Sequence, residues 1–163
     1  MIESWVLTVD DWPWWRELRL AALAEAPYAF GSRLADWQGD GDREERWRAR
    51  LGVPGSCSLL AVLDGRPVGM AGGVPGAREG VVELVSLWVR GEARGRGVGD
   101  HLVRAVERWA AARAEVLELA VAPGNGHAIA LYRRHGFEDT GRPGDLMPDG
   151  RRERVMAKRL RSG

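Results

Sequence analysis

The sequence predicts an α+β fold, a mixed and mostly antiparallel sheet of about seven strands with helices on both faces. Short apolar runs rich in β-branched residues alternate along the chain with longer stretches in which apolar residues recur at helical spacing. The Asp64-Gly65 pair between two strand-like runs is typical of a tight hairpin, which makes those strands antiparallel neighbours. The length of 163 residues fits one domain that spans the whole chain, 1–163.

The N-terminal third is expected to supply one strand and two helices. Residues 5–9 alternate apolar side chains as a strand does. The next helix would be capped by Asp10 and Asp11 and would end before Pro27, since the residue before a proline avoids the helical region. A second helix is expected within residues 43–51.

The remaining elements follow from the same two periodicities and from clusters of Gly and Pro. Strands are expected at 58–63, 67–74, 81–89, 115–121, from 137 to 140 and at 152–160, helices from 98 to about 113 and from 125 to about 135, and loops at 26–31 and 141–150. Gly69, Gly72 and Gly73 would weaken the strand at 67–74 or mark a bend in it.

Composition argues against several classes of protein. The formal net charge of +1 is not that of a dedicated nucleic-acid binder, which usually carries a marked basic excess. No run approaches the length of about 18 apolar residues that can cross a membrane, and the first residues lack the basic and apolar segments of a secretory signal. With Cys57 as the single cysteine, no intramolecular disulfide can form, and the sequence indicates a cytoplasmic protein.

A glycine-rich turn after the central strand is the best candidate for a binding site. Gly95, Gly97 and Gly99 have no Cβ, so their N–H groups can approach a ligand closely, and the helix that starts there adds partial positive charge. Such a turn suits a phosphate or a pyrophosphate. A dinucleotide-binding fingerprint would need glycine where Asp100 stands, and a P-loop would need a lysine that the turn lacks.

Two motifs carry a resemblance to a known family. The pattern Arg94-x-x-Gly97-x-Gly99 resembles motif A of the GNAT superfamily of N-acetyltransferases, whose turn holds the pyrophosphate of acetyl-CoA. A later strand is followed by residues that are similar to motif B of that superfamily, namely Asn125, Ala128, Leu131, Tyr132, Gly136 and Phe137. The resemblance covers positions 81–137. It implies a parallel strand–helix–strand unit and a sheet that splays open beside its central strand.

The resemblance also implies an acetyl-CoA site. The backbone of Leu87, Trp88 and Val89 would pair with the pantetheine amides. The complete set of expected contacts is Leu87, Trp88, Val89, Arg94, Gly95, Arg96, Gly97, Val98, Gly99, Asn125, Ala128 and Tyr132. Asn125 can equally be a helix cap, and the two arginines can equally be solvated surface charges. Gly91 stands where the family often has proline, and the glycine would make the turn looser.

Two residues are candidates for proton transfer. Tyr132 would act as the general acid toward the departing thiolate, although a tyrosine here can also simply pack its helix against the sheet. Glu83, a carboxylate in an otherwise apolar strand, would be the general base, because burial raises the pKa of a carboxyl group. An ion pair with an arginine explains Glu83 equally well, and some members of the family deprotonate the amine through ordered water. The histidines and Cys57 share no metal-ligand spacing, so no metal is expected.

These expectations together describe an acetyl-CoA-dependent N-acetyltransferase, in which a primary amine attacks the thioester directly in a ternary complex. The alternative is a non-catalytic acyl-CoA-binding or regulatory module on the same fold. The acceptor would be a small-molecule or peptide amine, and amino acids, polyamines, aminoglycosides and protein N-termini all stay open. One wall of its pocket would carry Tyr28, Phe30, Trp37 and Trp47. No nucleic acid or membrane partner is expected, and a homodimer is compatible with the resemblance because dimers are common in the family.

Overall fold

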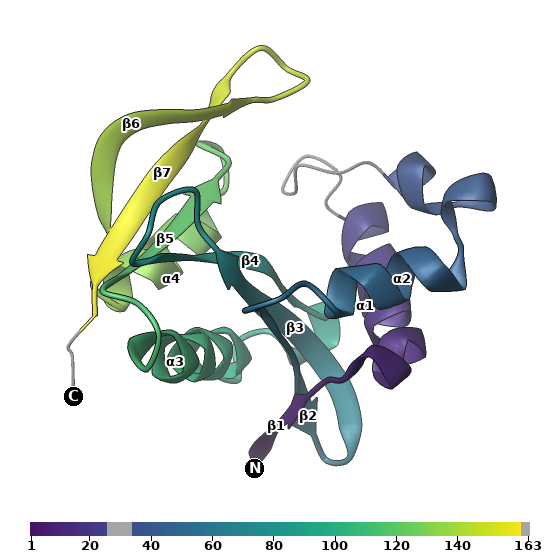
Figure 1. The fold of residues 1–163 in the computed structure, drawn as a ribbon. Coiled ribbons are helices and arrows are strands. Elements are labelled where there is room, and N and C mark those ends of the chain that lie inside the picture. Colours follow the sequence, from purple (N-terminus) through teal and green to yellow (C-terminus); the bar gives the residue numbers. More distant parts are fainter. Residues whose placement is uncertain (26–33, 161–163) are drawn as a thin grey trace.

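The computed structural model describes residues 1–25 and 34–160 and builds them around one seven-stranded sheet (Figure 1). The strands are β1 (Ile2–Val6), β2 (Cys57–Leu63), β3 (Arg66–Pro75), β4 (Val81–Val89), β5 (Val116–Val121), β6 (Glu138–Leu146) and β7 (Arg152–Arg159). Their order is β1-β2-β3-β4-β5-β7-β6, and each adjacent pair is antiparallel except β4 and β5, which are parallel. The predicted mixed, mostly antiparallel sheet is confirmed.

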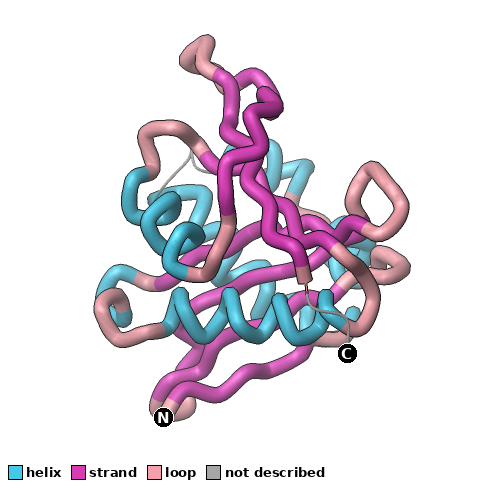
Figure 2. The backbone as a smooth tube through the Cα atoms, turned by 90° about the vertical axis from the view of Figure 1, so that its left-hand side faces the viewer, coloured by secondary structure: helices cyan, strands magenta, loops and turns pink. Residues whose placement is uncertain are grey.

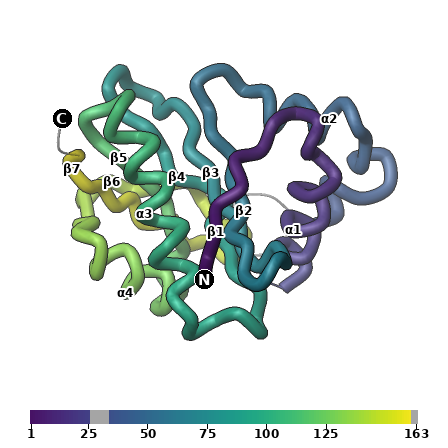
Figure 3. Tube along the Cα trace, turned by 90° about the horizontal axis from the view of Figure 1, so that it is seen from below, coloured from purple at the N-terminus to yellow at the C-terminus, as the bar shows by residue number. Residues whose placement is uncertain are grey.

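Helices cover both faces of this sheet (Figure 3). On one face lie α1 (Trp12–Glu25) and α2 (Glu44–Leu51), and on the other lie α3 (Val98–Ala111) and α4 (Gly126–Arg134). Short 3-10 turns occupy Val9–Asp11, Leu34–Trp37, Gly39–Gly41 and Gly91–Ala93. The helices predicted from periodicity are therefore confirmed, with their ends shifted by a few residues.

Each face of the sheet has its own hydrophobic core, because side chains alternate along the strands. In β2, Leu59 and Ala61 enter the core beneath α3, whereas Leu60 enters the core beneath α1 and α2. The second core is rich in tryptophan and includes the fully buried Trp15 and Trp47. These side chains pack the two N-terminal helices against the sheet.

Glycines in β3 let α3 lie close against the sheet (Figure 2). A Cβ atom at Gly73 would lie 2.5 Å from Cζ3 of Trp109, and one at Gly69 would lie 3.1 Å from Cδ1 of Leu102. Both distances are shorter than ordinary van der Waals contact. The glycines that weaken β3 as a strand are thus needed for the packing of a helix across it.

The first strand lies earlier than predicted, at Ile2–Val6 instead of 5–9. It pairs with residues 59–63 of β2. The N–H of Thr8 then donates to Oδ2 of Asp11 at 2.7 Å, which ends the extended segment and begins a 3-10 turn. Thr8 is the N-cap of this turn, and Asp11 takes part as the third residue of a capping box. The turn leads directly into α1, the helix for which Asp10 and Asp11 were the expected caps.

The loop predicted at 141–150 is wrong over its first half, because β6 continues to Leu146. β6 is an edge strand that pairs with β7 in a hairpin projecting from the body of the molecule (Figures 1 and 2). Glycine and proline are tolerated there, since the outer N–H groups of an edge strand need no partner in the sheet. Register shifts on both sides of Pro143 absorb the irregularity.

Candidate active site

The sheet opens between its two parallel strands. β4 and β5 pair only from Val81 to Glu83 on one strand and from Val116 to Glu118 on the other. Beyond that point, residues 84–89 of β4 have no strand partner on this side in the described part of the chain. The opening therefore exposes strand backbone in the middle of the molecule.

A bulge at Ser86 changes the direction of the β4 side chains at this opening. Ser86 has a φ of +58°, a left-handed value that is uncommon outside glycine. The register with β3 passes from Val85 opposite Gly72 to Trp88 opposite Met70, so β4 has one residue more than β3 between these pairs. As a result, Val85 and Trp88 both face the α1 and α2 side although they are three residues apart.

Backbone groups of β4 point alternately toward β3 and toward the opening. The N–H of Arg90 donates to the Val68 carbonyl next to β4 at 2.7 Å. Alternation then directs the N–H and C=O of Leu87 and Val89 toward the opening and those of Trp88 toward β3. Leu87 and Val89 can therefore pair with an extended ligand, but this geometry does not support the contact expected from Trp88.

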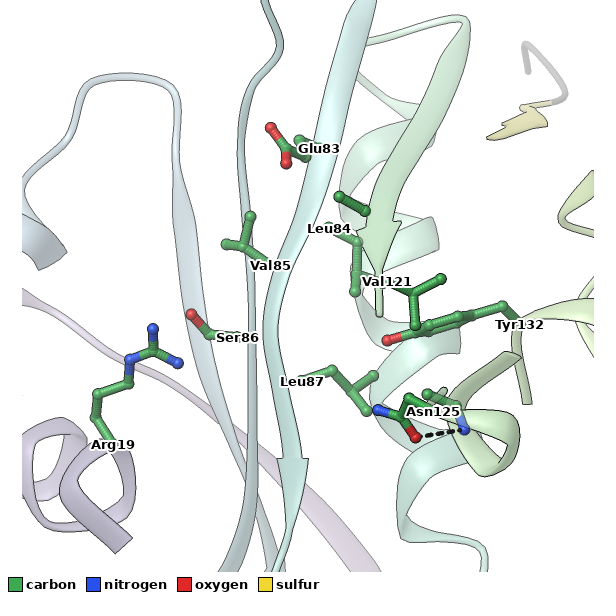
Figure 4. A pocket seen from close by; sticks show the side chains of 11 residues that line it. Arg19, Glu83, Leu84, Val85, Ser86, Leu87, Val121, Asn125 and Tyr132 are labelled. Carbon is green, nitrogen blue, oxygen red and sulfur yellow. Dashed lines mark hydrogen bonds between the residues drawn. The ribbon is translucent and has the colours of Figure 1, made fainter. Parts of the chain in front are cut away.

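A pocket of about 210 Å³ lies at the opening (Figure 4). It is lined by Arg19, Glu83, Leu84, Val85, Ser86, Leu87, Ala120, Val121, Asn125, Ala128 and Tyr132. Both predicted catalytic residues, Glu83 and Tyr132, thus share one cavity with three further predicted cofactor contacts, Leu87, Asn125 and Ala128, although these residues come from β4 and from α4 and its N-cap. Of the expected aromatic wall, Tyr28 and Phe30 lie outside the described residues, and Trp47 is buried in the core beside Trp37.

Glu83 lies at the pocket with no ion pair to any arginine within residues 1–25 and 34–160. Burial raises the pKa of its carboxyl group, and the nearby charges of Glu118 and Asp145 raise it further. Glu118 itself is paired with two arginines, at 2.5 Å to Arg78 and 2.7 Å to Arg142. Within the described part of the chain, the Glu83 carboxylate therefore lies beside the pocket without the arginine partner that the ion-pair interpretation requires.

Tyr132 lies across the opening from Glu83, on the side of α4 (Figure 4). Its side chain is buried, its ring packs edge-on against Phe137 with 5.8 Å between the ring centroids, and its hydroxyl forms no hydrogen bond to any described residue. Burial raises the pKa of the phenol, so the group stays protonated at physiological pH. A packing role and a proton-donating role are both compatible with this position.

Asn125 is the N-cap of α4, where its Oδ1 accepts from the N–H of Ala128 at 3.3 Å (Figure 4). The predicted capping role is therefore confirmed. Both residues also line the pocket. The cap thus fixes the start of α4, and with it the place of Tyr132 two turns later.

The glycine turn leads into α3 with an N-terminus that no described side chain caps. Gly95 and Gly97 have φ values of +78° and +81°, and a Cβ atom on either would lie within 4 Å of no described residue apart from its chain neighbours. The open space and the free N–H groups of the first turn fit a pyrophosphate. The neighbouring Val98 is buried in the core, and a Cβ on Gly99 would lie 3.2 Å from Leu131, so these two also position α3.

The two arginines of the turn, Arg94 and Arg96, differ in their contacts with the rest of the protein. Arg94 Nε donates to the Val89 carbonyl at 3.1 Å, and its guanidinium is paired with Glu25 on α1. Arg94 thereby ties the end of β4 to the end of α1, whereas Arg96 is exposed. Of the two, Arg96 is the one with its charge available to a ligand at the turn.

Two features at the site carried no signal in the sequence. Arg19 of α1 lines the pocket, and burial followed by the charge of Arg50 lowers its pKa to about 10. An arginine on an amphipathic helix normally indicates a solvated face, so spacing alone did not distinguish it. Asp100 lies 2.7 Å from Nε2 of His135 and so joins the start of α3 to the end of α4, which no local pattern predicts.

No group of three or more metal-ligating side chains occurs among the residues that the structure describes. No described helix has the length and apolarity that crossing a membrane requires.

The sequence is similar to known acetyltransferases. The model of the acetyltransferase (GNAT) family matches residues 14–137. L-Methionine sulfoximine/L-methionine sulfone acetyltransferases of Pseudomonas paraeruginosa and Pseudomonas aeruginosa are each 42% identical to this chain over 57 residues. That match covers 34% of this chain and 33% of each relative, so the chain spans about a third of the length of the curated relatives it matches.

Solved structures cover the whole length. The ribosomal-protein-alanine N-acetyltransferase of Brucella melitensis is 27% identical, with a TM-score of 0.75 over 98% of this chain and 99% of that chain. YncA of Salmonella typhimurium, solved with its cofactor acetyl-CoA, is 19% identical, with a TM-score of 0.75 over 100% of this chain and 96% of that chain.

Proposed function

Because the chain belongs to the acetyltransferase (GNAT) family, we propose that it transfers an acetyl group from acetyl-CoA to a primary amine. The observation that carries this proposal is the opening between β4 and β5, which has Glu83 on one side and Tyr132 on the other. N-acetyltransferase activity in the Brucella melitensis protein, similar over nearly its full length, supports an amine as the acceptor.

The residues of the opening fit the co-substrate. Leu87 and Val89 would pair with the pantetheine arm, and the first N–H groups of α3, with the turn at Gly95 and Gly97, would hold the pyrophosphate. Bound acetyl-CoA supplies an electrophilic thioester carbonyl and a thiolate leaving group. This arrangement would bring the reacting carbon to the pocket, while the glycine turn holds the distal phosphates.

Glu83 is proposed as the general base. An amine must lose a proton before or during attack, and a carboxylate of raised pKa accepts that proton more readily than an ordinary one. The proton passes to Glu83 directly or through one water. A new C–N bond then forms as the thioester C–S bond breaks, so no covalent enzyme intermediate is needed.

Tyr132 is proposed as the general acid on the other side of the opening. Its hydroxyl would give a proton to the departing sulfur, which balances the proton taken up by Glu83. The N–H groups of Leu87 or Val89 would stabilise the negative charge that develops on the carbonyl oxygen. The free thiol of CoA has a pKa near 8.5, like that of cysteine, so this protonation assists the departure of the thiolate without being essential to it.

The experiment is a thiol-release assay with acetyl-CoA and a panel of amino acids, polyamines, aminoglycosides and peptides with free N-termini. Release that depends on an amine, together with an acetylated product by mass spectrometry, supports the proposal. Calorimetric binding of acetyl-CoA without release for any amine would favour the alternative, a non-catalytic acyl-CoA-binding module.

A further inference from the structure

We infer that the acceptor is a zwitterion, an amine whose own molecule carries a carboxylate, and that Arg19 and Arg50 form the binding site for that carboxylate. The inference rests on the proposed function and narrows its acceptor from four chemical classes to amino-acid-like molecules. It follows from the charges on the α1 and α2 side of the opening.

Two guanidinium groups converge on this side of β4. Arg19 extends from α1 toward Ser86 and lines the pocket (Figure 4). Arg50, from α2, lies over β3, since a Cβ on Gly72 would be 3.2 Å from its Nη2 and 3.4 Å from Val85 Cγ2. Val85 also lines the pocket. The absence of a side chain at Gly72 thus makes room for a second cation next to the first.

Arg50 has no carboxylate partner within residues 1–25 and 34–160. Its Nη1 donates to Ser58 Oγ at 3.4 Å, and its guanidinium lies 5.0 Å from the Trp15 ring centroid. Its Nη2 is buried and has no hydrogen-bond partner among the described residues. Residues 26–33, which the structure does not describe, contain no Asp or Glu. Burying a charged group with an unsatisfied donor is costly, so a negative charge in the adjoining pocket would offset part of that cost.

The two arginines also repel each other. Burial and the charge of Arg50 both disfavour the charged form of Arg19. A carboxylate near both groups would offset their mutual repulsion through charge-assisted hydrogen bonds. The planar guanidinium suits this task, because its parallel N–H groups match the two oxygens of a carboxylate.

Glu83 completes the charge pattern of the pocket. It lies on the same side of β4 as Arg19, nearer the start of the strand than Ser86 (Figure 4). A zwitterion would set its ammonium toward Glu83 and its carboxylate toward Arg19. The pocket volume of about 210 Å³ is below the 300–1,000 Å³ typical of sites for drug-sized ligands, which suits an amino acid better than an aminoglycoside. Polyamines would bring further positive charge to a site that already holds two cations.

The test compares matched acceptors on the wild-type protein. Each proteinogenic amino acid is assayed beside its α-carboxamide, which keeps the amine and the side chain but lacks the negative charge. We expect kcat/KM for the best amino acid to exceed that of its carboxamide by about 10- to 100-fold, the range for one charge-assisted contact. Equal or faster turnover of the carboxamide, or of a polyamine, overturns the inference and leaves the transferase proposal intact.

Variants locate the site. Arg19→Gln is expected to reduce the preference for the free acid to less than about threefold, mainly through a higher KM, whereas Arg19→Lys should keep part of it. The control is Arg159→Gln, an exposed arginine at the end of β7 opposite Val116, far from the pocket end of β5. Unchanged acetyl-CoA affinity by calorimetry shows that each variant is folded. An unchanged preference for the free acid in Arg19→Gln refutes the assignment of the carboxylate site. If no amine of the panel causes thiol release, the transferase proposal is refuted instead.

Discussion

Replacing Glu83 with glutamine separates a catalytic role from a structural one, because the two roles predict opposite signs for stability. The substitution keeps the size of the side chain and removes its negative charge. The carboxylate is half-buried, has no ion pair to an arginine in the described ranges, and is raised in pKa by burial, Glu118 and Asp145. We therefore expect Glu83→Gln to lower activity and to raise stability at neutral pH.

The loss of activity has a calculable range. General-base catalysis typically contributes about 10²- to 10⁴-fold, which corresponds to about 2.7–5.4 kcal/mol of activation free energy. The ratio of wild-type activity to Glu83→Gln activity should be greatest above the folded-state pKa of Glu83. It should shrink as the pH falls through that value, because protonated wild-type Glu83 has no more basicity than glutamine. Ionisation of the amine affects both proteins equally and cancels in the ratio.

The gain in stability follows from proton linkage. A carboxyl group whose pKa is raised in the folded state binds its proton more tightly when folded than when unfolded. Below the unfolded-state pKa both states hold the proton, and Glu83 makes no difference. Above it the unfolded state loses its proton first, so the charged group costs stability up to neutral pH and beyond. Glu83→Gln removes that cost at neutral pH but not in acid.

The assay is thiol release for the best amine, together with thermal unfolding, each measured between about pH 4 and pH 8. Glu3→Gln, on an exposed edge of β1, is the matched control and should change neither quantity. Asp145→Asn should move the acid limb of the wild-type profile to lower pH. A wild-type-to-variant ratio that is flat across pH refutes the base role, and a lower melting temperature at neutral pH shows that Glu83 has a stabilising partner.

Three further substitutions, one of them with a matched control, test other parts of the structure. Tyr132→Phe should lower kcat by about 10²-fold with acetyl-CoA affinity nearly unchanged, since the hydroxyl bonds to no described residue; an unchanged kcat in steady-state assays rejects the general-acid role. Gly73→Ala should cost about 1–3 kcal/mol by chemical denaturation, because the new Cβ would meet Trp109 at 2.5 Å, whereas Gly91→Ala, whose Cβ would meet no described residue within 4 Å, should cost far less. Asn125→Ala should cost about 1 kcal/mol in the same measurement through loss of the cap, and an equal stability of variant and wild type contradicts the capping contact.

The sequence by itself determined the features that depend on short stretches of chain. The Asp64-Gly65 hairpin, the amphipathic α3 and the cap at Asn125 follow from spacing and from the conformational preferences of a few neighbouring residues. The glycine turn belongs to this class as well, since its positive φ values at Gly95 and Gly97 require glycine wherever the chain lies. The mixed α+β class followed from the order of these local elements.

For the two edge strands of the sheet, the local sequence patterns gave wrong predictions. In β6, glycine and proline predicted a loop, but pairing with β7 supplies one row of hydrogen bonds, and the other row faces away from the sheet. In β1, the pairing register with β2 sets the limits of the strand, whereas the alternation of apolar side chains predicted a strand that begins three residues too late in the sequence. Both errors arise because an edge strand is defined by its one neighbour and only weakly by its own side chains.

Only the tertiary structure decided which charges meet. Arg19 and Glu83 lie 64 positions apart in the sequence and share a pocket because α1 packs on the face of β4 that carries Glu83. Arg50 reaches the same face because Gly72 leaves space for it. The bulge at Ser86 sets which β4 side chains face that side, and its register depends on pairing with β3. Charges act through space, and a sequence pattern measures distance only along the chain.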